Sequence, residues 1–103
     1  MVRGEVRWYT FGPPDKKRPV LILTRSSIIH YLGEVTVAPI TSTIRDIPSE
    51  VVLEESDGMP KTCAVNCDHV QTVEKSKVGP LITAVSRRKM DEVRQAVIFA
   101  LNL

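Results

Sequence analysis

Two cysteines, an aspartate and a histidine lie close together in the sequence and are the first candidates for chemistry. Cys63, Cys67, Asp68 and His69 carry the ligand types that bind zinc. In an extended strand, however, residues four positions apart are separated by roughly 13 Å, whereas both thiolates of a zinc site lie ~2.3 Å from the metal. We therefore expect no metal here and interpret Cys63 and Cys67 as free, half-buried thiols.

Motifs of covalent and phosphate-binding enzymes are missing from the sequence. It contains no Gly-x-Ser-x-Gly elbow, and its five glycines do not have the spacing of a phosphate-binding loop. His30 and His69 could form the paired imidazoles of a nuclease, but two isolated surface histidines are the favoured interpretation. The remaining candidates are residues 17–19 (Lys-Arg-Pro), residues 41–43 (Thr-Ser-Thr) and the pair at 68–69. Hydropathy patterns alone do not bring these three groups together.

Alternating and apolar segments predict short strands through the first eighty residues. Residues 4–10 alternate with the period of a half-buried strand. Residues 19–24 are apolar at both odd and even positions, which predicts a central strand that is buried on both faces and begins at Pro19. Residues 34–40 are rich in β-branched side chains and predict a strand in which Pro39 marks a bulge or an edge. Further strands are expected at 50–54, within 62–73 and at 80–85.

The end of the chain changes to a helical period. Apolar residues recur every three or four positions from Met90 to Leu101, which predicts an amphipathic helix over residues 87–101 with Ser86 as its N-cap. Five or six short strands and one C-terminal helix indicate a mainly β fold, a small bent sheet or barrel. A length of 103 residues is sufficient for one domain, which we expect to span residues 1–103.

Composition and charge exclude several classes of protein. Hydrophobic residues make up 43% and charged residues 25%, which excludes general disorder. Apolar runs such as residues 20–23 are too short for a membrane helix, and the start of the chain carries no secretion signal, so we expect a cytoplasmic protein. Residues 1–25 hold six basic and two acidic side chains, and residues 46–57 hold five acidic and no basic ones. This asymmetry is compatible with an anion-binding face.

Three segments, in this order, resemble the MazF/PemK/Kid toxins of bacterial toxin–antitoxin systems. Residues 3–8 are similar to the Arg-Gly-Glu/Asp-hydrophobic start of that family, and residues 17–23 to its Arg-Pro-hydrophobic strand. Residues 37–44 are similar to its hydrophobic-Pro-hydrophobic-Thr-Ser/Thr segment. A weaker fourth segment, residues 66–73, resembles its Asp-Gln-hydrophobic-Arg/Lys-Thr/Ser-hydrophobic strand. Together with the C-terminal helix, the resemblance covers essentially the whole chain.

The resemblance implies an SH3-like barrel of the CcdB/Kid/MazF type and a homodimer. It also implies a sequence-specific endoribonuclease that needs no metal or cofactor, in which a 2′-hydroxyl of single-stranded RNA attacks the neighbouring phosphorus. The products are a cyclic phosphate and a 5′-hydroxyl. A cognate MazE-like antitoxin with an acidic C-terminal segment is the implied inhibitor. The alternative is a CcdB-like, non-enzymatic gyrase inhibitor, but residues 100–103 lack the Trp-Gly-Ile terminus that CcdB uses.

The same resemblance implies roles for individual residues. Arg18 aligns with the family's catalytic arginine, whose guanidinium suits the charge of a phosphorane. Thr41 aligns with the catalytic threonine, and Asp68 with an aspartate proposed as the base in Kid-like members. His69 is the other candidate base, but strand alternation would put it on the opposite face from Asp68, which we favour. The expected RNA contacts are Arg3, Arg7, Lys16, Lys17, Ser42, His69 and Gln71.

One segment departs from the family pattern. The loop at residues 11–17 carries two lysines but lacks the glutamate that many relatives have before the Arg-Pro pair. The cleavage sequence therefore does not transfer to this chain. Tyr9 and Phe11 are candidates for base stacking, with packing as an equally good explanation for both.

Overall fold

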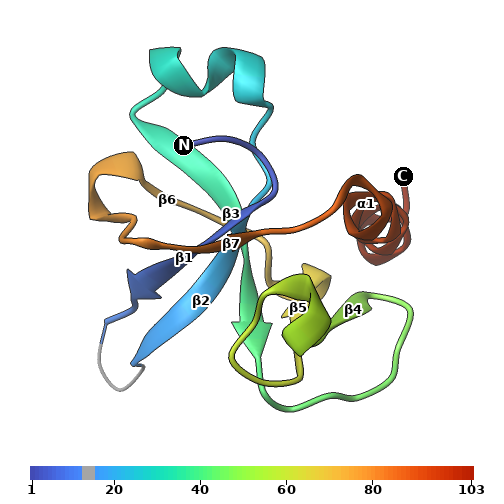
Figure 1. Ribbon diagram of the computed structural model, residues 1–103. Helices are drawn as coiled ribbons and strands as arrows, with labels where there is room; N and C mark the ends of the chain where they lie inside the picture. The colour runs from blue at the N-terminus through green and yellow to red at the C-terminus, as the bar shows by residue number, and fades with distance from the viewer. Residues whose placement is uncertain (13–15) are drawn as a thin grey trace.

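Seven short strands form one strongly curled sheet, and a single α-helix lies beside it, in the parts of the chain that the structure describes (Figure 1). The structure is a computed structural model that describes residues 1–12 and 16–103, so the middle of the expected loop at 11–17 lies outside the described residues. The strands are β1 (Glu5–Thr10), β2 (Lys17–Ile22), β3 (Glu34–Thr41), β4 (Glu50–Leu53), β5 (Cys63–Asn66), β6 (Gln71–Glu74) and β7 (Leu81–Ala84). The helices are α1 (Arg87–Leu101) and the short 3₁₀ turns η1 (Ser26–Tyr31), η2 (Glu55–Asp57), η3 (Cys67–His69) and η4 (Lys75–Lys77). The mainly β fold with a C-terminal helix is thus confirmed.

Strand β3 organises the sheet because it pairs with three other strands. The strand order is β4-β5-β3-β2-β1-β7, and β6 pairs with the first half of β3. Along one edge of β3, residues 34–37 pair with β6 and residues 40–41 pair with β5. Pro39 falls between these two pairings, where its missing N–H removes no ladder hydrogen bond. The expected bulge or edge at Pro39 is therefore a change of partner in a central strand.

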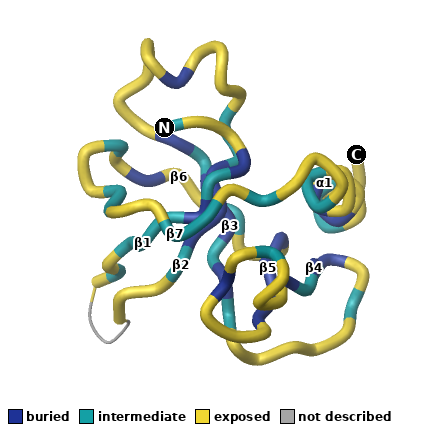
Figure 2. Tube along the Cα trace, viewed as in Figure 1, coloured by how far each residue is buried: buried dark blue, intermediate teal, exposed yellow. Residues whose placement is uncertain are grey.

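Strand β2 is buried on both faces, as its apolar sequence predicts. Leu21 points into one core cluster, whereas Val20 and Ile22 point into the other, and all three are fully buried. Figure 2 shows this buried crossing of strands at the centre of the molecule, with exposed turns around it. The strand begins at Lys17, two residues earlier than expected. Pro19 is tolerated there because Trp8, opposite it, makes its backbone hydrogen bonds to residues 79 and 80 instead.

The C-terminal helix begins and ends where the sequence predicts. The Ser86 hydroxyl accepts a hydrogen bond from the Lys89 N–H at 3.1 Å and caps α1. Val93 and Ala96 bury one side of the helix in the core cluster that contains Leu21. In the described residues, no helix is long and apolar enough to cross a membrane.

Candidate functional site

Arg18 and Thr41 lie on neighbouring antiparallel strands and line the same two cavities. Val20 of β2 pairs with Pro39 of β3, and continuing this register by two residues brings Arg18 opposite Thr41. The larger cavity has a volume of about 740 Å³ and the smaller one about 340 Å³. Arg18 and Thr41, the two residues that the sequence analysis expects to be catalytic, therefore form a ridge between two hollows.

The larger cavity, here called the lysine pocket, is positively charged. Four cations line it, and three consecutive hydroxyl side chains from residues 41–43 face them. Among the described lining residues there is no carboxylate. The ammonium of Lys17 also lies 5.1 Å from the centre of the Trp8 ring, in cation–π contact. The four cations are Lys16, Lys17, Arg18 and Lys61.

The smaller cavity, here called the histidine pocket, carries groups suited to proton transfer and to base recognition. His69 and Gln71 line it together with Arg18 and Thr41, and Phe11 adds an aromatic wall. The Phe11 ring packs edge-on against Tyr9, with centroids 4.8 Å apart, so the wall is held in place. This arrangement assembles a phosphate-binding cation, a hydroxyl, an imidazole and an amide around one small hollow.

Asp68, the favoured base in the sequence analysis, lines neither cavity. The chain leaves the strand conformation at residues 67–69 and turns through η3, so strand alternation does not govern this segment. The Asp68 carboxylate accepts a hydrogen bond from the Ser49 hydroxyl and lies 3.9 Å from the Arg45 guanidinium. The structure therefore brings His69, rather than Asp68, to the ridge of Arg18 and Thr41.

The two arginines near the N-terminus also lie away from the ridge. Arg7 donates to Glu5 at 3.0 Å and to the Gly79 carbonyl at 3.1 Å, which fixes it between β1 and the chain that enters β7. Burial by itself raises the pKa of Glu5, but hydrogen bonds from a backbone N–H and from Arg7 outweigh it and hold that pKa below its usual value. Arg3 donates to the Leu23 carbonyl and lines a third cavity. The sequence shows that these two arginines are present but not where their side chains point.

Both cysteines are buried free thiols, as expected from the sequence. Burial raises the pKa of Cys63, and it raises the pKa of Cys67 to about 11. Both thiols therefore stay protonated near neutral pH, and Cys63, although it lines the lysine pocket, is a poor nucleophile. Across residues 1–12 and 16–103, no three His, Cys, Asp or Glu side chains are grouped in a way that could hold a metal ion.

The expected RNA contacts omit Lys61, Thr43 and Asn66, which also line the two pockets, although Thr43 belongs to the candidate Thr-Ser-Thr run. Thr43 follows Thr41 in a polar run, and Asn66 lies in the weak fourth segment of resemblance. Lys61 arrives from the connection between β4 and β5, and only a turn signal at residues 57–60 (Asp-Gly-Met-Pro) precedes it. Local sequence predicts this turn but not the cavity that it borders.

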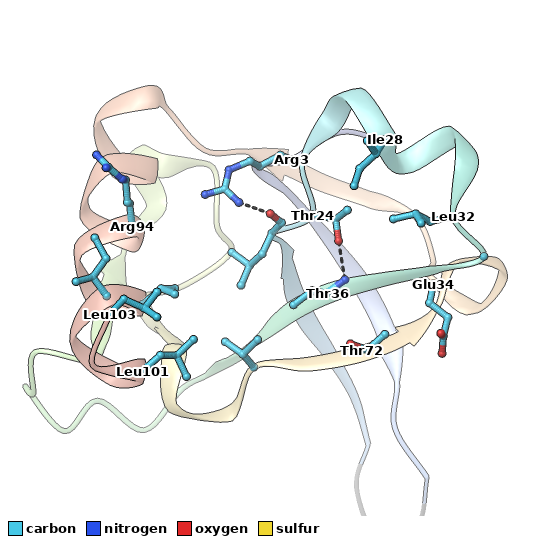
Figure 3. A pocket seen from close by; sticks show the side chains of 15 residues that line it. Arg3, Thr24, Ile28, Leu32, Glu34, Thr36, Thr72, Arg94, Leu101 and Leu103 are labelled. Atoms are coloured by element: carbon cyan, nitrogen blue, oxygen red, sulfur yellow. Dashed lines mark hydrogen bonds between the residues drawn. The ribbon is translucent and has the colours of Figure 1, made fainter.

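The third cavity is an apolar groove of about 870 Å³ between α1, η1 and the paired strands β3 and β6 (Figure 3). Ile28, Leu101 and Leu103 line it, although 43%, 54% and 79% of these residues remain exposed. Three charged side chains, two arginines and Glu34, also line the groove. Its chemistry differs from that of the lysine pocket, because apolar side chains dominate and charges of both signs are present.

Comparison with known proteins places the chain in a family. The model of the PemK-like, MazF-like toxins of type II toxin–antitoxin systems matches residues 2–101. The probable endoribonuclease MazF5 of Mycobacterium tuberculosis is 47% identical over 82% of this chain and 75% of its own. The structure of the Mycobacterium tuberculosis toxin MazF-mt6 is similar with a TM-score of 0.88 and 33% identity, over 96% of this chain and 97% of that one.

A mycobacterial endoribonuclease solved in complex with its cognate antitoxin is similar with a TM-score of 0.90 and 27% identity, over 100% of this chain and 96% of that one. These similarities confirm the expected fold type and the family suggested by the sequence segments. The chain therefore belongs to the PemK-like, MazF-like toxins of type II toxin–antitoxin systems.

Proposed function

We propose that this chain is a sequence-specific endoribonuclease toxin that cleaves single-stranded RNA without a metal ion or cofactor. Family membership and relatives named endoribonucleases support the reaction class. The observation that carries the proposal is the ridge of Arg18 and Thr41 between two pockets with cationic walls and no carboxylate among their described residues. A polyanion threaded over this ridge meets only attractive or neutral side chains.

The reaction is an attack by the 2′-hydroxyl of one nucleotide on the phosphorus that follows it. The bond from O2′ to phosphorus forms while the bond from phosphorus to the 5′-oxygen breaks. The 2′-hydroxyl gives its proton to a base and the leaving 5′-oxygen takes one from water, which leaves a 2′,3′-cyclic phosphate and a 5′-hydroxyl. The guanidinium of Arg18 offers a fork of donors to two phosphate oxygens as negative charge develops. The hydroxyl of Thr41 donates a hydrogen bond to the same group.

His69 is the base that takes the proton from the 2′-hydroxyl. Its place in the histidine pocket with Arg18 and Thr41 supports this role. Asp68 acts as a positioning residue, because its bond to the Ser49 hydroxyl ties η3 to the segment that leads from β3 to β4. Lys16, Lys17, Ser42 and Gln71 are the proposed RNA contacts in the two pockets, together with His69. Arg3 and Arg7 take no part in our proposal, because both lie outside these pockets.

The active form is a homodimer that uses the apolar groove for its self-contact. Exposed leucine and isoleucine side chains of this kind mark protein interfaces in soluble proteins. The groove carries two arginines and Glu34. In a two-fold symmetric dimer, the second copy brings both positive and negative side chains to the contact, so that opposite charges of the two copies can pair. A second copy therefore fits this groove better than RNA does.

The inhibitor is a cognate antitoxin whose acidic segment occupies the cationic pockets. A related mycobacterial endoribonuclease was solved in complex with its cognate antitoxin, which supports such a partner. Carboxylates of the antitoxin would pair with the same lysines that hold RNA phosphates. We place the toxin and its RNA substrate in the cytoplasm.

An RNA-cleavage assay with paired variants tests the proposed machinery. Arg18→Ala is expected to lower kcat by about a hundredfold or more, because the main source of charge stabilisation is lost. Thr41→Ala is expected to lower kcat while RNA affinity is largely retained. Arg25→Ala is the matched control, because Arg25 is exposed and lines none of the three cavities. Full activity of Arg18→Ala would refute the assignment of the ridge.

A supercoiling assay distinguishes the proposed RNA cleavage from the rival function, gyrase inhibition. A gyrase poison would block supercoiling and leave RNA intact. The proposed ribonuclease cleaves RNA and leaves supercoiling unchanged.

A further inference from the structure

We propose that the lysine pocket binds the nucleotide on the 3′ side of the cut and that Lys61 contacts the phosphate that follows this nucleotide. The inference rests on the proposed endoribonuclease function and adds to it a direction for the RNA and a residue that sequence reasoning missed. It follows from the placement of two pockets on either side of one ridge.

The direction follows from the chemistry of the attack. The base must touch the 2′-hydroxyl, which belongs to the nucleotide on the 5′ side of the cut, so this nucleotide lies at the pocket that contains His69. In an in-line displacement, the leaving 5′-oxygen departs on the side of phosphorus opposite to the attacking oxygen. With the scissile phosphate held over Arg18 and Thr41, the leaving nucleotide points toward the lysine pocket.

The lysine pocket has the size and charge for that nucleotide. Its volume of about 740 Å³ exceeds the 340 Å³ of the histidine pocket and lies within the range of small-ligand sites. Lys16, Lys17 and Lys61 supply positive charge beyond the ridge, and the described residues give none of them a carboxylate partner. An ammonium group that is not committed to an internal ion pair is available to an RNA phosphate.

The loop that carries Lys61 is held in a defined conformation. Gly58 adopts a left-handed conformation with φ of 96° at the end of η2, and the adjacent Met59 is only 4% exposed. The Thr83 hydroxyl donates to the Asp57 carbonyl at 3.2 Å and ties this turn to β7. Residues 57–59, just before Lys61, are thus held against both the core and the sheet, and this turn brings Lys61 to the wall of the lysine pocket.

A thermodynamic cycle, which combines a substitution of Lys61 with a change in the RNA substrate, tests the proposal. Both substrates derive from an RNA oligonucleotide that the wild-type protein cuts, with one nucleoside on the 3′ side of the cut. One version ends in a 3′-hydroxyl, and the other carries a 3′-phosphate on that nucleoside. For the wild type we expect kcat/KM to be about tenfold higher with the phosphate, as for one charge-assisted contact.

The Lys61→Ala variant is expected to lose this gain and to cleave the two substrates with equal kcat/KM. Lys61→Gln keeps most of the side chain's length and is expected to behave in the same way, which guards against a folding defect of the alanine variant. Lys77→Ala removes one positive charge outside all three cavities and is expected to keep the tenfold gain.

Two results would overturn the inference. In one, both Lys61 variants retain the gain from the 3′-phosphate. In the other, they lose activity equally on both substrates, so that no coupling exists between Lys61 and that phosphate. A failure of the underlying function is distinct, because the wild-type protein would then cut neither RNA.

Discussion

At the scale of single residues, our choice of the base for the reaction rests on the different positions of two neighbouring side chains. Asp68 and His69 are adjacent, yet the aspartate bonds to Ser49 and the histidine lines a pocket with Arg18 and Thr41. Strand alternation predicts that only one of the two residues faces the pocket, but it does not govern this segment. It does not identify which one, because the segment is a turn whose direction depends on contacts from residues 45–50.

This assignment predicts opposite effects for substitutions at the two positions. His69→Ala is expected to lower kcat by about a hundredfold or more, because proton abstraction loses its base. Asp68→Asn is expected to leave kcat within about threefold of wild type, because the amide oxygen still accepts from Ser49 and the exposed contact with Arg45 contributes little. Single-turnover cleavage of a fluorescent RNA measures both values. A large loss for Asp68→Asn with little change for His69→Ala would restore Asp68 as the base.

At the scale of elements, the segment from η3 into β6 serves two cavities at once. His69 and Gln71 line the histidine pocket, whereas Val70 and Thr72 line the apolar groove. Strand β3 divides similarly along its length, with Thr36 in the groove and its other end at the two pockets. The proposed RNA site and the proposed dimer face therefore lie toward opposite ends of β3.

The elements with a strong periodic pattern could be predicted from the sequence. Strand β2 and helix α1 show their burial directly in their hydropathy, and the structure confirms both. The turn η3 was not predicted from the sequence. Asn66 was a signal for it, since an asparagine side chain can stabilise a turn, and here the Asn66 side chain accepts a hydrogen bond from the Asp68 N–H at 3.1 Å. The pockets could not be predicted, because Lys61 reaches the lysine pocket, and Ser49 holds the neighbour of His69, through tertiary contacts that no local pattern encodes.

The turn at Gly58 gives a prediction for the element that carries Lys61. Gly58 has φ of 96°, and a Cβ added there would lie 2.2 Å from the Thr83 hydroxyl oxygen. Gly58→Ala is therefore expected to lower the free energy of unfolding by about 1–3 kcal/mol and to weaken cleavage, because the loop must shift. Gly12→Ala is the control, since a Cβ there meets nothing within 4 Å and Gly12 lines none of the three cavities. Urea unfolding of both variants measures the difference, and equal stability would show that the turn is not constrained.

At the scale of the whole molecule, two surfaces of different chemistry are available for two different partners. The ridge with its two pockets is cationic, and the groove beside α1 is mainly apolar. The net charge of +2 hides this division, because none of the described residues that line the two pockets is acidic. RNA or an acidic antitoxin suits the first surface, and a second copy of the chain suits the second.

Substitutions at two exposed leucines distinguish a specific effect on self-association from a general effect of added surface charge. Leu101 lines the groove and is 54% exposed, whereas Leu81 is 51% exposed and lies outside all three cavities. Leu101→Glu is expected to weaken dimerisation by about tenfold or more, because an apolar contact is lost and a charged side chain must be taken out of water at the interface. Leu81→Glu is expected to leave dimerisation unchanged. Light scattering over a concentration series measures both, and an unchanged dimer for Leu101→Glu would exclude this face.

The most direct test of the central claim is the chemistry of the RNA ends that the wild-type protein produces in EDTA. A mixed pool of RNA is incubated with the purified protein, and the termini of the products are identified by end-specific ligation, sequencing and mass spectrometry. The account predicts cleavage at a short recurring sequence, with a 2′,3′-cyclic phosphate on one fragment and a 5′-hydroxyl on the other. Intact RNA, a requirement for Mg²⁺, or products with 5′-phosphate ends would contradict it.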